Sequence, residues 1–204
     1  RRVDGQMVLT PPELLKRALA DRALERVPEP GLTPAAVLLL LYQKDGDYCV
    51  LLNKRSEEVE YHRGEISFPG GARDPEDGDS LDTALRETEE EMGILRGDVT
   101  VLGEMDEVTT RSRFRVQVFA GTIEYPYDFD PNADEIAEVV EFPITALKDP
   151  NSRRVETHWQ QGGPVNTYSY AYGEHLVFGA TARILQQFLG LLDDGLESED
   201  QQIE

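Results

Sequence analysis

The chain has 204 residues, 39% of them hydrophobic and 29% charged, a balance typical of a folded domain rather than a disordered segment. Its 40 acidic and 20 basic residues give a net charge of −20, which disfavours binding to nucleic-acid backbones and to anionic membranes. A single cysteine, Cys49, excludes an internal disulfide and agrees with a reducing compartment.

Nothing in the sequence predicts a membrane or export segment. The longest apolar run, from Ala35 to Tyr42, is far shorter than the roughly 20 residues that a spanning helix needs. The first residues lead into no hydrophobic region, so no signal peptide is expected. We therefore expect a cytoplasmic protein.

The first 30 residues are predicted to form a helical extension of the main domain. Thr10 is suited to cap a helix, and two prolines follow it in the first turn. The negative charge of Glu13 is favourable near the positive N-terminal end of the helix. Apolar residues then recur at helical spacing up to Ala23. Prolines at positions 28, 30 and 34 end this pattern and indicate a linker.

The next segment predicts a hairpin, a loop and a helix. Residues 35–42 and 48–53 are apolar enough for two buried strands, and the Asp-Gly pair within residues 44–47 is a strong hairpin signal. Residues 55–71 are expected to form a loop. Ser80 is the predicted cap of a helix that ends near Met92, where Gly93 stops it.

The remaining elements predict a mixed sheet and a final helix. Strands are expected over residues 99–108, 114–123, 136–142, 153–159 and 167–172, and an amphipathic helix over residues 180–192. The acidic segment 193–204 is expected to be solvated and frayed. Strands and helices do not alternate regularly, which favours an α/β or α+β domain with a mixed sheet over a doubly wound one.

Three glutamates on the predicted helix 80–92 indicate a site for a divalent cation. Glu87, Glu90 and Glu91 stand at i, i+3 and i+4, so they share one helix face. The three carboxylates repel one another, and a bound cation would offset this repulsion. Mg²⁺ is suited to the role because it prefers oxygen ligands. Arg86 lies four residues before Glu90 and is placed to hold one carboxylate, while Gly70–Gly71 allows a backbone carbonyl to approach the cation.

The same segment resembles a known family motif. Gly71 together with residues 86–94 is similar to the Nudix box, which ends in Arg-Glu-apolar-any-Glu-Glu-any-Gly-apolar. Thr88 stands where the box has an aliphatic residue, and Asp77 stands where it has glutamate. One extra residue separates that position from Arg86.

A second motif lies upstream of the first. Residues 51–56, His62, Gly64 and residues 68–71 resemble the signature of the coenzyme A diphosphatases within the Nudix superfamily. The departures from that signature are Asn53 for threonine, Val59 for leucine and Glu60 for arginine. Because an acidic Glu60 would repel a 3′-phosphate, ADP-ribose or a dinucleotide stays open as the substrate.

The resemblance implies a fold and a reaction. The fold is an α/β/α sandwich with a mixed sheet, spanning residues 31–192. The reaction is hydrolysis of the diphosphate bond of coenzyme A or an acyl derivative, dependent on Mg²⁺ or Mn²⁺, giving adenosine 3′,5′-bisphosphate and 4′-phosphopantetheine. A non-catalytic nucleotide-binding domain on the same fold is the alternative from another class. The partner is thus a small nucleotide, and a homodimer is left open.

The resemblance also implies roles for single residues. The expected cation ligands are Glu87, Glu91, Glu90 and the carbonyl of Gly71. The expected catalytic set is Glu90, Glu135 as the general base, and Arg86 as an ion-pair partner, with Glu138 as the second choice for the base and a mechanism without a dedicated base also open. The expected substrate contacts are Arg55, Ser56, His62 and Gly70. Apart from the resemblance, the position of Arg111 and Arg113 after two threonines makes them further candidates.

Overall fold

The computed structural model describes residues 2–3, 6–7, 9–20, 22–57, 64–160 and 162–200. Its main sheet has seven strands: β3 (Thr33–Lys44), β4 (Asp47–Arg55), β5 (Ile66–Ser67), β6 (Gly70–Ala72), β7 (Thr100–Thr109), β8 (Phe114–Thr122) and β9 (Ile136–Pro143). The order is β5-β4-β3-β8-β7, with β6 paired to β3 and β9 paired to β4. Because β3 and β8 run parallel while the other pairs are antiparallel, the sheet is mixed, as predicted.

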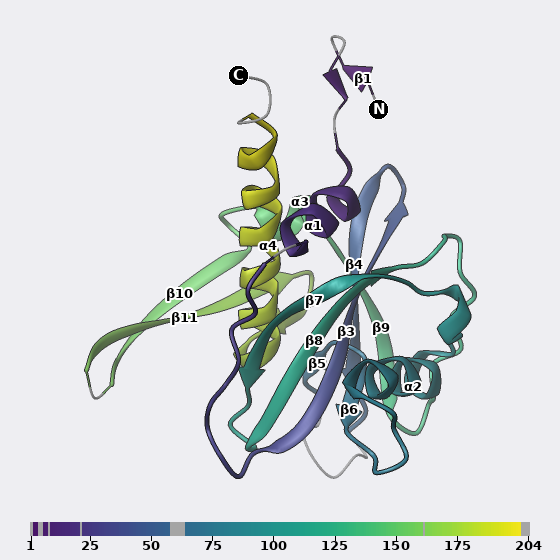
Figure 1. The fold of residues 1–204 in the computed structure, drawn as a ribbon, viewed down its shortest axis with the longest axis vertical. Coiled ribbons are helices and arrows are strands. Elements are labelled where there is room, and N and C mark those ends of the chain that lie inside the picture. Colours follow the sequence, from purple (N-terminus) through teal and green to yellow (C-terminus); the bar gives the residue numbers. More distant parts are fainter. Residues whose placement is uncertain are drawn as a thin grey trace.

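Helices cover both faces of this sheet. Helix α2 (Ser80–Met92) lies on one face, and α1 (Pro11–Leu19) and α4 (Gly179–Asp200) lie on the other (Figure 1). Successive residues of β3 point to opposite faces, so Leu38 and Leu40 pack in the apolar cluster of α2 while Leu39 and Leu41 pack in that of α4. The uninterrupted apolar run of β3 follows from burial on both faces.

A second, three-stranded sheet adjoins the α4 side. It consists of β10 (Arg153–Gln160), β11 (Gly163–Tyr172) and β12 (His175–Val177), and the β10–β11 hairpin projects from the body of the protein (Figure 1). Its inner end is anchored, because Tyr170 and Val177 are buried in the same cluster as α4. The short elements β1 (Arg2–Val3), β2 (Gln6–Met7), α3 (Ile144–Lys148) and a 3₁₀ turn at Arg96–Asp98 complete the fold.

Two predicted features differ in the structure. Residues 55–71, expected to be a loop, contain β5 and the start of β6, which are too short to give a sequence pattern. The last helix continues to Asp200, so the prediction that the chain frays from residue 193 is wrong for residues 193–200. Gly195 helps to hold this last part of α4 in place, because the absence of a side chain there lets α4 approach the backbone of α1 at Leu14.

Within the described residues, no helix combines the length and the apolar character that crossing a lipid bilayer requires.

Candidate active site

Capping residues at both ends determine where helix α2 begins and ends. The carboxylate of Asp79 accepts a hydrogen bond from the Asp82 amide at 2.8 Å, so Asp79 is the N-cap and the prediction of Ser80 in that role is wrong. Gly93 adopts a left-handed conformation with φ of 69°, and its amide donates to the Glu89 carbonyl at 2.9 Å. These caps set the helical phase that places the three glutamates of the predicted cation site.

The three glutamates differ sharply in exposure. Glu91 points into the protein and its side chain is 2% exposed, the side chain of Glu87 is 18% exposed, and that of Glu90 is 56% exposed. The face therefore runs from the sheet outward to solvent. A ligand that contacts all three carboxylates would have to sit at this boundary.

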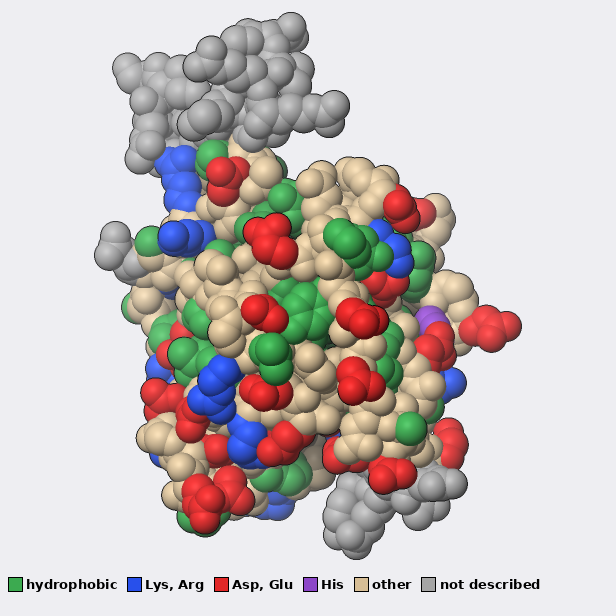
Figure 2. Space-filling view, turned by 90° about the vertical axis from the view of Figure 1, so that its right-hand side faces the viewer, with side chains coloured by type: hydrophobic (Ala, Val, Ile, Leu, Met, Phe, Trp, Pro, Cys, Tyr) green, Lys and Arg blue, Asp and Glu red, His purple; other side chains and the backbone are tan. Residues whose placement is uncertain are grey.

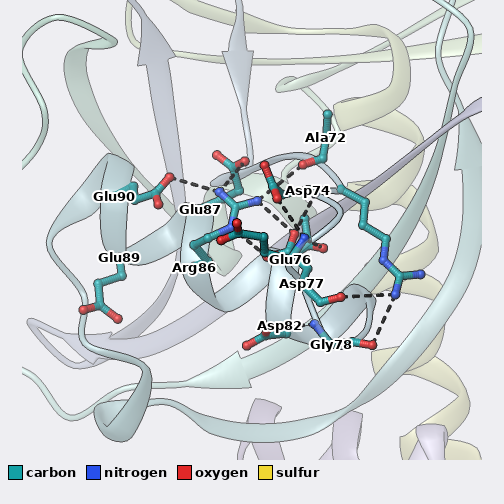
Figure 3. Close-up of polar contacts among 12 residues, drawn as sticks. Ala72, Asp74, Glu76, Asp77, Gly78, Asp82, Arg86, Glu87, Glu89 and Glu90 are labelled. Carbon is teal, nitrogen blue, oxygen red and sulfur yellow. Dashed lines mark hydrogen bonds and ion pairs between the residues drawn. The ribbon is translucent and has the colours of Figure 1, made fainter.

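Arg86 ties the outer part of this face together (Figure 3). Its Nε and Nη2 donate to the two oxygens of Asp77 at 2.8 and 3.0 Å, and its Nη1 donates to Glu87 and to Glu90 at 3.0 Å each. Nη2 also contacts the carbonyl of Ala72 at 3.4 Å. The guanidinium holds the pKa of Asp77 well below its usual range. Arg86 thus contacts Glu90, as the i to i+4 spacing predicts.

Glu91 is held by groups from two other elements. Its Oε2 accepts hydrogen bonds from Asn53 Nδ2 at 3.0 Å and from the Gly70 amide at 3.1 Å, and its Oε1 pairs with Arg55 Nη1 at 3.3 Å. Burial nevertheless raises the pKa of Glu91 to about 7, with the carboxylates of Glu87 and Glu135 adding to the effect. A cation beside Glu91 would offset this cost.

Glu87 lies directly against the backbone of β6. A Cβ atom placed on Gly71 would come within 2.5 Å of Glu87 Cδ and Oε1, so only glycine leaves room for this carboxylate. Burial also raises the pKa of Glu87. The donor set of carboxylates and a nearby backbone carbonyl suits Mg²⁺ or Mn²⁺.

The described residues do not form a closed cage for a cation. No three His, Cys, Asp or Glu side chains among them have the spacing of a complete metal site. A closed cage is not required, because Mg²⁺ is usually held by one or two carboxylates together with water and substrate phosphates. The residues present therefore fit an open site of that kind.

The loop before β9 brings Glu135 close to the carboxylates of α2. The amides of Asn132 and Asp130 donate to the carbonyls of Glu91 and Met92 at 3.0 and 3.1 Å, which attaches the loop to the end of α2. Asn132 Nδ2 then donates to the Glu135 carboxylate at 3.1 Å. This carboxylate is close enough to raise the pKa of both Glu87 and Glu91.

Glu138, the second choice for the general base, lies on the other face of the sheet. It pairs across the strands with Lys54 and forms an ion pair with His175 Nε2 of β12 at 3.2 Å. Lys54 and Glu138 line a cavity of about 520 Å³ together with Tyr172, Gly173, Glu174 and His175. The structure therefore separates Glu138 from the carboxylates of α2.

The predicted substrate contacts are only partly brought together. Arg55 lies beside Glu91, and the amide of the buried Ser56 donates to the Glu135 carbonyl at 2.7 Å. The Gly70 amide is used by Glu91. His62 and Glu60 lie outside the described residues.

Arg113 is placed elsewhere. It contacts Glu29 at 3.6 Å and the carbonyl of Gly31 at 3.5 Å, so it packs on the N-terminal segment. Arg111 is exposed in the same turn.

The sequence interpretation missed Asn53 as a partner of Glu91. The sequence signal is that Asn53 is a polar residue directly after the apolar run of β4, and the structure shows that its side chain is fully buried. Buried polar side chains are nearly always hydrogen-bonded, so a partner was to be expected.

Comparisons with known proteins identify the family of the chain. Residues 32–160 match the family model described as NUDIX domain. The mitochondrial coenzyme A diphosphatase NUDT8 of Mus musculus is 36% identical over 170 residues, which cover 79% of each chain. An uncharacterized Nudix hydrolase NudL of Photorhabdus laumondii is 33% identical over 75% of this chain and 81% of its own.

Among solved structures, a MutT/nudix family protein from Enterococcus faecalis shares the fold. It has a TM-score of 0.53 and 19% identity, over 92% of this chain and 76% of its own. The family resemblance predicted from residues 71 and 86–94 is thereby confirmed.

Proposed function

The chain belongs to the Nudix family, and we propose that it hydrolyses the diphosphate bond of coenzyme A or an acyl derivative in the presence of Mg²⁺ or Mn²⁺. The products would be adenosine 3′,5′-bisphosphate and 4′-phosphopantetheine. The observation that carries the choice of substrate is the 36% identity to a mammalian coenzyme A diphosphatase over 79% of both chains. Residues 51–56 and 68–71, which resemble the signature of that branch, support it.

The charge of the protein makes a cation necessary for such a substrate. Acidic side chains are spread over the face shown in Figure 2, and the net charge is −20. We assign the cation to Glu87, Glu91, Glu90 and the carbonyl of Gly71. When bound, it would neutralise the diphosphate and lower the pKa of the attacking water.

The chain's own residues position and activate the reactants. Arg86 holds Glu87 and Glu90 at 3.0 Å each, which fixes the carboxylates before the substrate arrives. Arg55 and Ser56 would contact the substrate phosphates, and His62 and Gly70 complete the proposed substrate set. We assign Glu135 as the group that accepts the proton of the attacking water, because its carboxylate is held beside Glu87 and Glu91.

A product assay tests the substrate. The protein would be incubated with Mg²⁺ and, separately, with coenzyme A, ADP-ribose and diadenosine polyphosphates, and the products separated by chromatography. Adenosine 3′,5′-bisphosphate formed fastest from coenzyme A is the expected result. AMP released from ADP-ribose with coenzyme A untouched would refute the substrate and keep the reaction class.

Two further measurements separate the alternatives. Glu60→Arg should improve turnover of coenzyme A if the acidic residue repels the 3′-phosphate, and no change would remove that reason for preferring ADP-ribose. Calorimetric binding of a nucleotide without product, in Mg²⁺ and in Mn²⁺, would favour the non-catalytic alternative.

A third measurement tests the cation ligands. Wild-type turnover in both Glu87→Gln and Glu91→Gln would contradict the cation assignment.

A further inference from the structure

Asn53 is a fully buried amide in contact with the innermost carboxylate of the site. It lies on β4, is 0% exposed, and donates from Nδ2 to Glu91 Oε2 at 3.0 Å. Burying an amide is costly unless its polar atoms are hydrogen-bonded. An apolar residue would fill this position at lower cost, so the contact with Glu91 is the feature that Asn53 adds.

Ser67 is the hydrogen-bond partner of the oxygen end of the Asn53 amide. The two residues are directly opposite each other in the β4–β5 pair, and Ser67 Oγ donates to Asn53 Oδ1 at 2.8 Å. An ionised carboxylate only accepts hydrogen bonds, whereas a serine hydroxyl can donate or accept, so it is Glu91 that requires the NH₂ end of Asn53 to face it. The bond from Ser67 satisfies Asn53 Oδ1 and thereby holds the buried side chain in place.

Among the described residues, the hydrogen bonds to Glu91 fall unequally on its two carboxylate oxygens. A carboxylate accepts about four hydrogen bonds, two at each oxygen. Within the part of the chain that the structure describes, Oε2 accepts from Asn53 and from the Gly70 amide, whereas Oε1 contacts Arg55. The two bonds to Oε2 thus fix the orientation of the carboxylate.

We propose that Asn53, held in place by Ser67, is a positioning residue that fixes the Glu91 carboxylate for cation binding and thereby sets the affinity of the protein for Mg²⁺ or Mn²⁺. The inference rests on the proposed function, because it takes Glu91 as a cation ligand. Asn53 itself contacts neither cation nor substrate. Groups that orient a metal ligand typically change metal affinity by about 10- to 100-fold when they are removed.

Direct Mn²⁺ binding to the full chain tests the proposal without relying on turnover. Free Mn²⁺ would be counted by electron paramagnetic resonance in titrations of wild type, Asn53→Leu, Ser67→Ala and the double variant. We expect Asn53→Leu to weaken binding about 10-fold or more, and Ser67→Ala to weaken it by a smaller factor of about 3. Because Ser67 acts through Asn53, the double variant should bind like Asn53→Leu alone.

Thr88→Val is the matched control. Thr88 is also fully buried, and its hydroxyl donates to the Ala84 carbonyl within α2 at 2.7 Å rather than to a carboxylate. Loss of this buried hydrogen bond should leave Mn²⁺ affinity unchanged. An equal loss of affinity in Thr88→Val and Asn53→Leu would reduce Asn53 to a structural role and overturn the proposal.

Glu91→Gln distinguishes failure of the inference from failure of the proposed function. If Glu91→Gln binds Mn²⁺ as tightly as wild type, the cation site itself is wrong and both proposals fall. If Glu91→Gln loses binding while a folded Asn53→Leu keeps wild-type affinity, the positioning role alone is refuted. Should Asn53→Leu not fold, unchanged affinity in Ser67→Ala gives the same refutation.

Discussion

Replacing Gly71 with alanine should damage the site without unfolding the protein. The added Cβ would lie 2.5 Å from Glu87 Cδ and Oε1, whereas an ordinary carbon contact needs about 3.5 Å. The Glu87 carboxylate must therefore move by about 1 Å. Because it is the far end of a flexible side chain and Gly71 has no positive φ, the fold can accept the change.

The displacement of the Glu87 carboxylate should lower the rate of catalysis. A displacement of about 1 Å in a positioning group costs about 100-fold in rate, which corresponds to about 2.7 kcal/mol of transition-state stabilisation. We expect kcat/KM for the diphosphate substrate to fall by about this factor and the melting temperature to change by only a few degrees. Both are measured on the purified variant, with Mg²⁺ varied over a wide range.

Two other glycines provide the comparison. Gly97→Ala adds a Cβ with nothing within 4 Å and should leave both quantities unchanged. Gly70→Ala should instead destabilise the fold, because φ is 150° and the Cβ would lie 2.3 Å from the Ala36 carbonyl. A folded Gly71→Ala variant with kcat/KM within about 3-fold of wild type would refute the placement of Glu87 at the reacting centre.

Three further predictions follow from the geometry of the site. In the metal-free protein, burial raises the pKa of Glu91 from 4.5 to about 7, so wild type should lose about 3 kcal/mol of stability as pH rises across that interval. Urea denaturation should then show that the free energy of unfolding of Glu91→Gln, relative to wild type, increases over the same pH range. A difference that does not depend on pH would contradict this prediction. Glu135→Gln should lower kcat by about 100-fold or more while Glu138→Gln, on the opposite face, stays near wild type in the product assay; equal effects would reject this choice of base. Asp77→Asn should lower the free energy of unfolding by about 2 kcal/mol, because it weakens the paired hydrogen bonds to Arg86, and an unchanged thermal midpoint would show that this pair contributes nothing.

The position of Glu138, the second choice for the general base, illustrates what sequence patterns fail to resolve. Strict alternation along β9 would place Ile136 and Glu138 on one face of the sheet. A register shift opposite Lys54 and Arg55 breaks the alternation, so Ile136 packs with the α2 cluster while Glu138 pairs with His175 on the other face. No local sequence signal marks this bulge, which depends on the pairing with β4.

The sequence by itself determined the features that depend on neighbours a few residues away. The helix 80–92, its end at Gly93, the shared face of its glutamates and the contact from Arg86 to Glu90 follow from helical spacing and local capping. The hairpin at residues 44–47 follows from its Asp-Gly pair, whose φ angles are both positive. The motif residues were sufficient to identify the family.

Only the tertiary structure decided how the glutamates differ from one another. Glu91 is buried and Glu90 is exposed because the sheet covers one side of α2, and the partners of Glu91 come from β4 and β6, distant in the chain. The Asn53–Ser67 pair exists because β5 aligns with β4 in one particular register. Such contacts depend on which strands pair and in what register, and local spacing along the chain does not encode either.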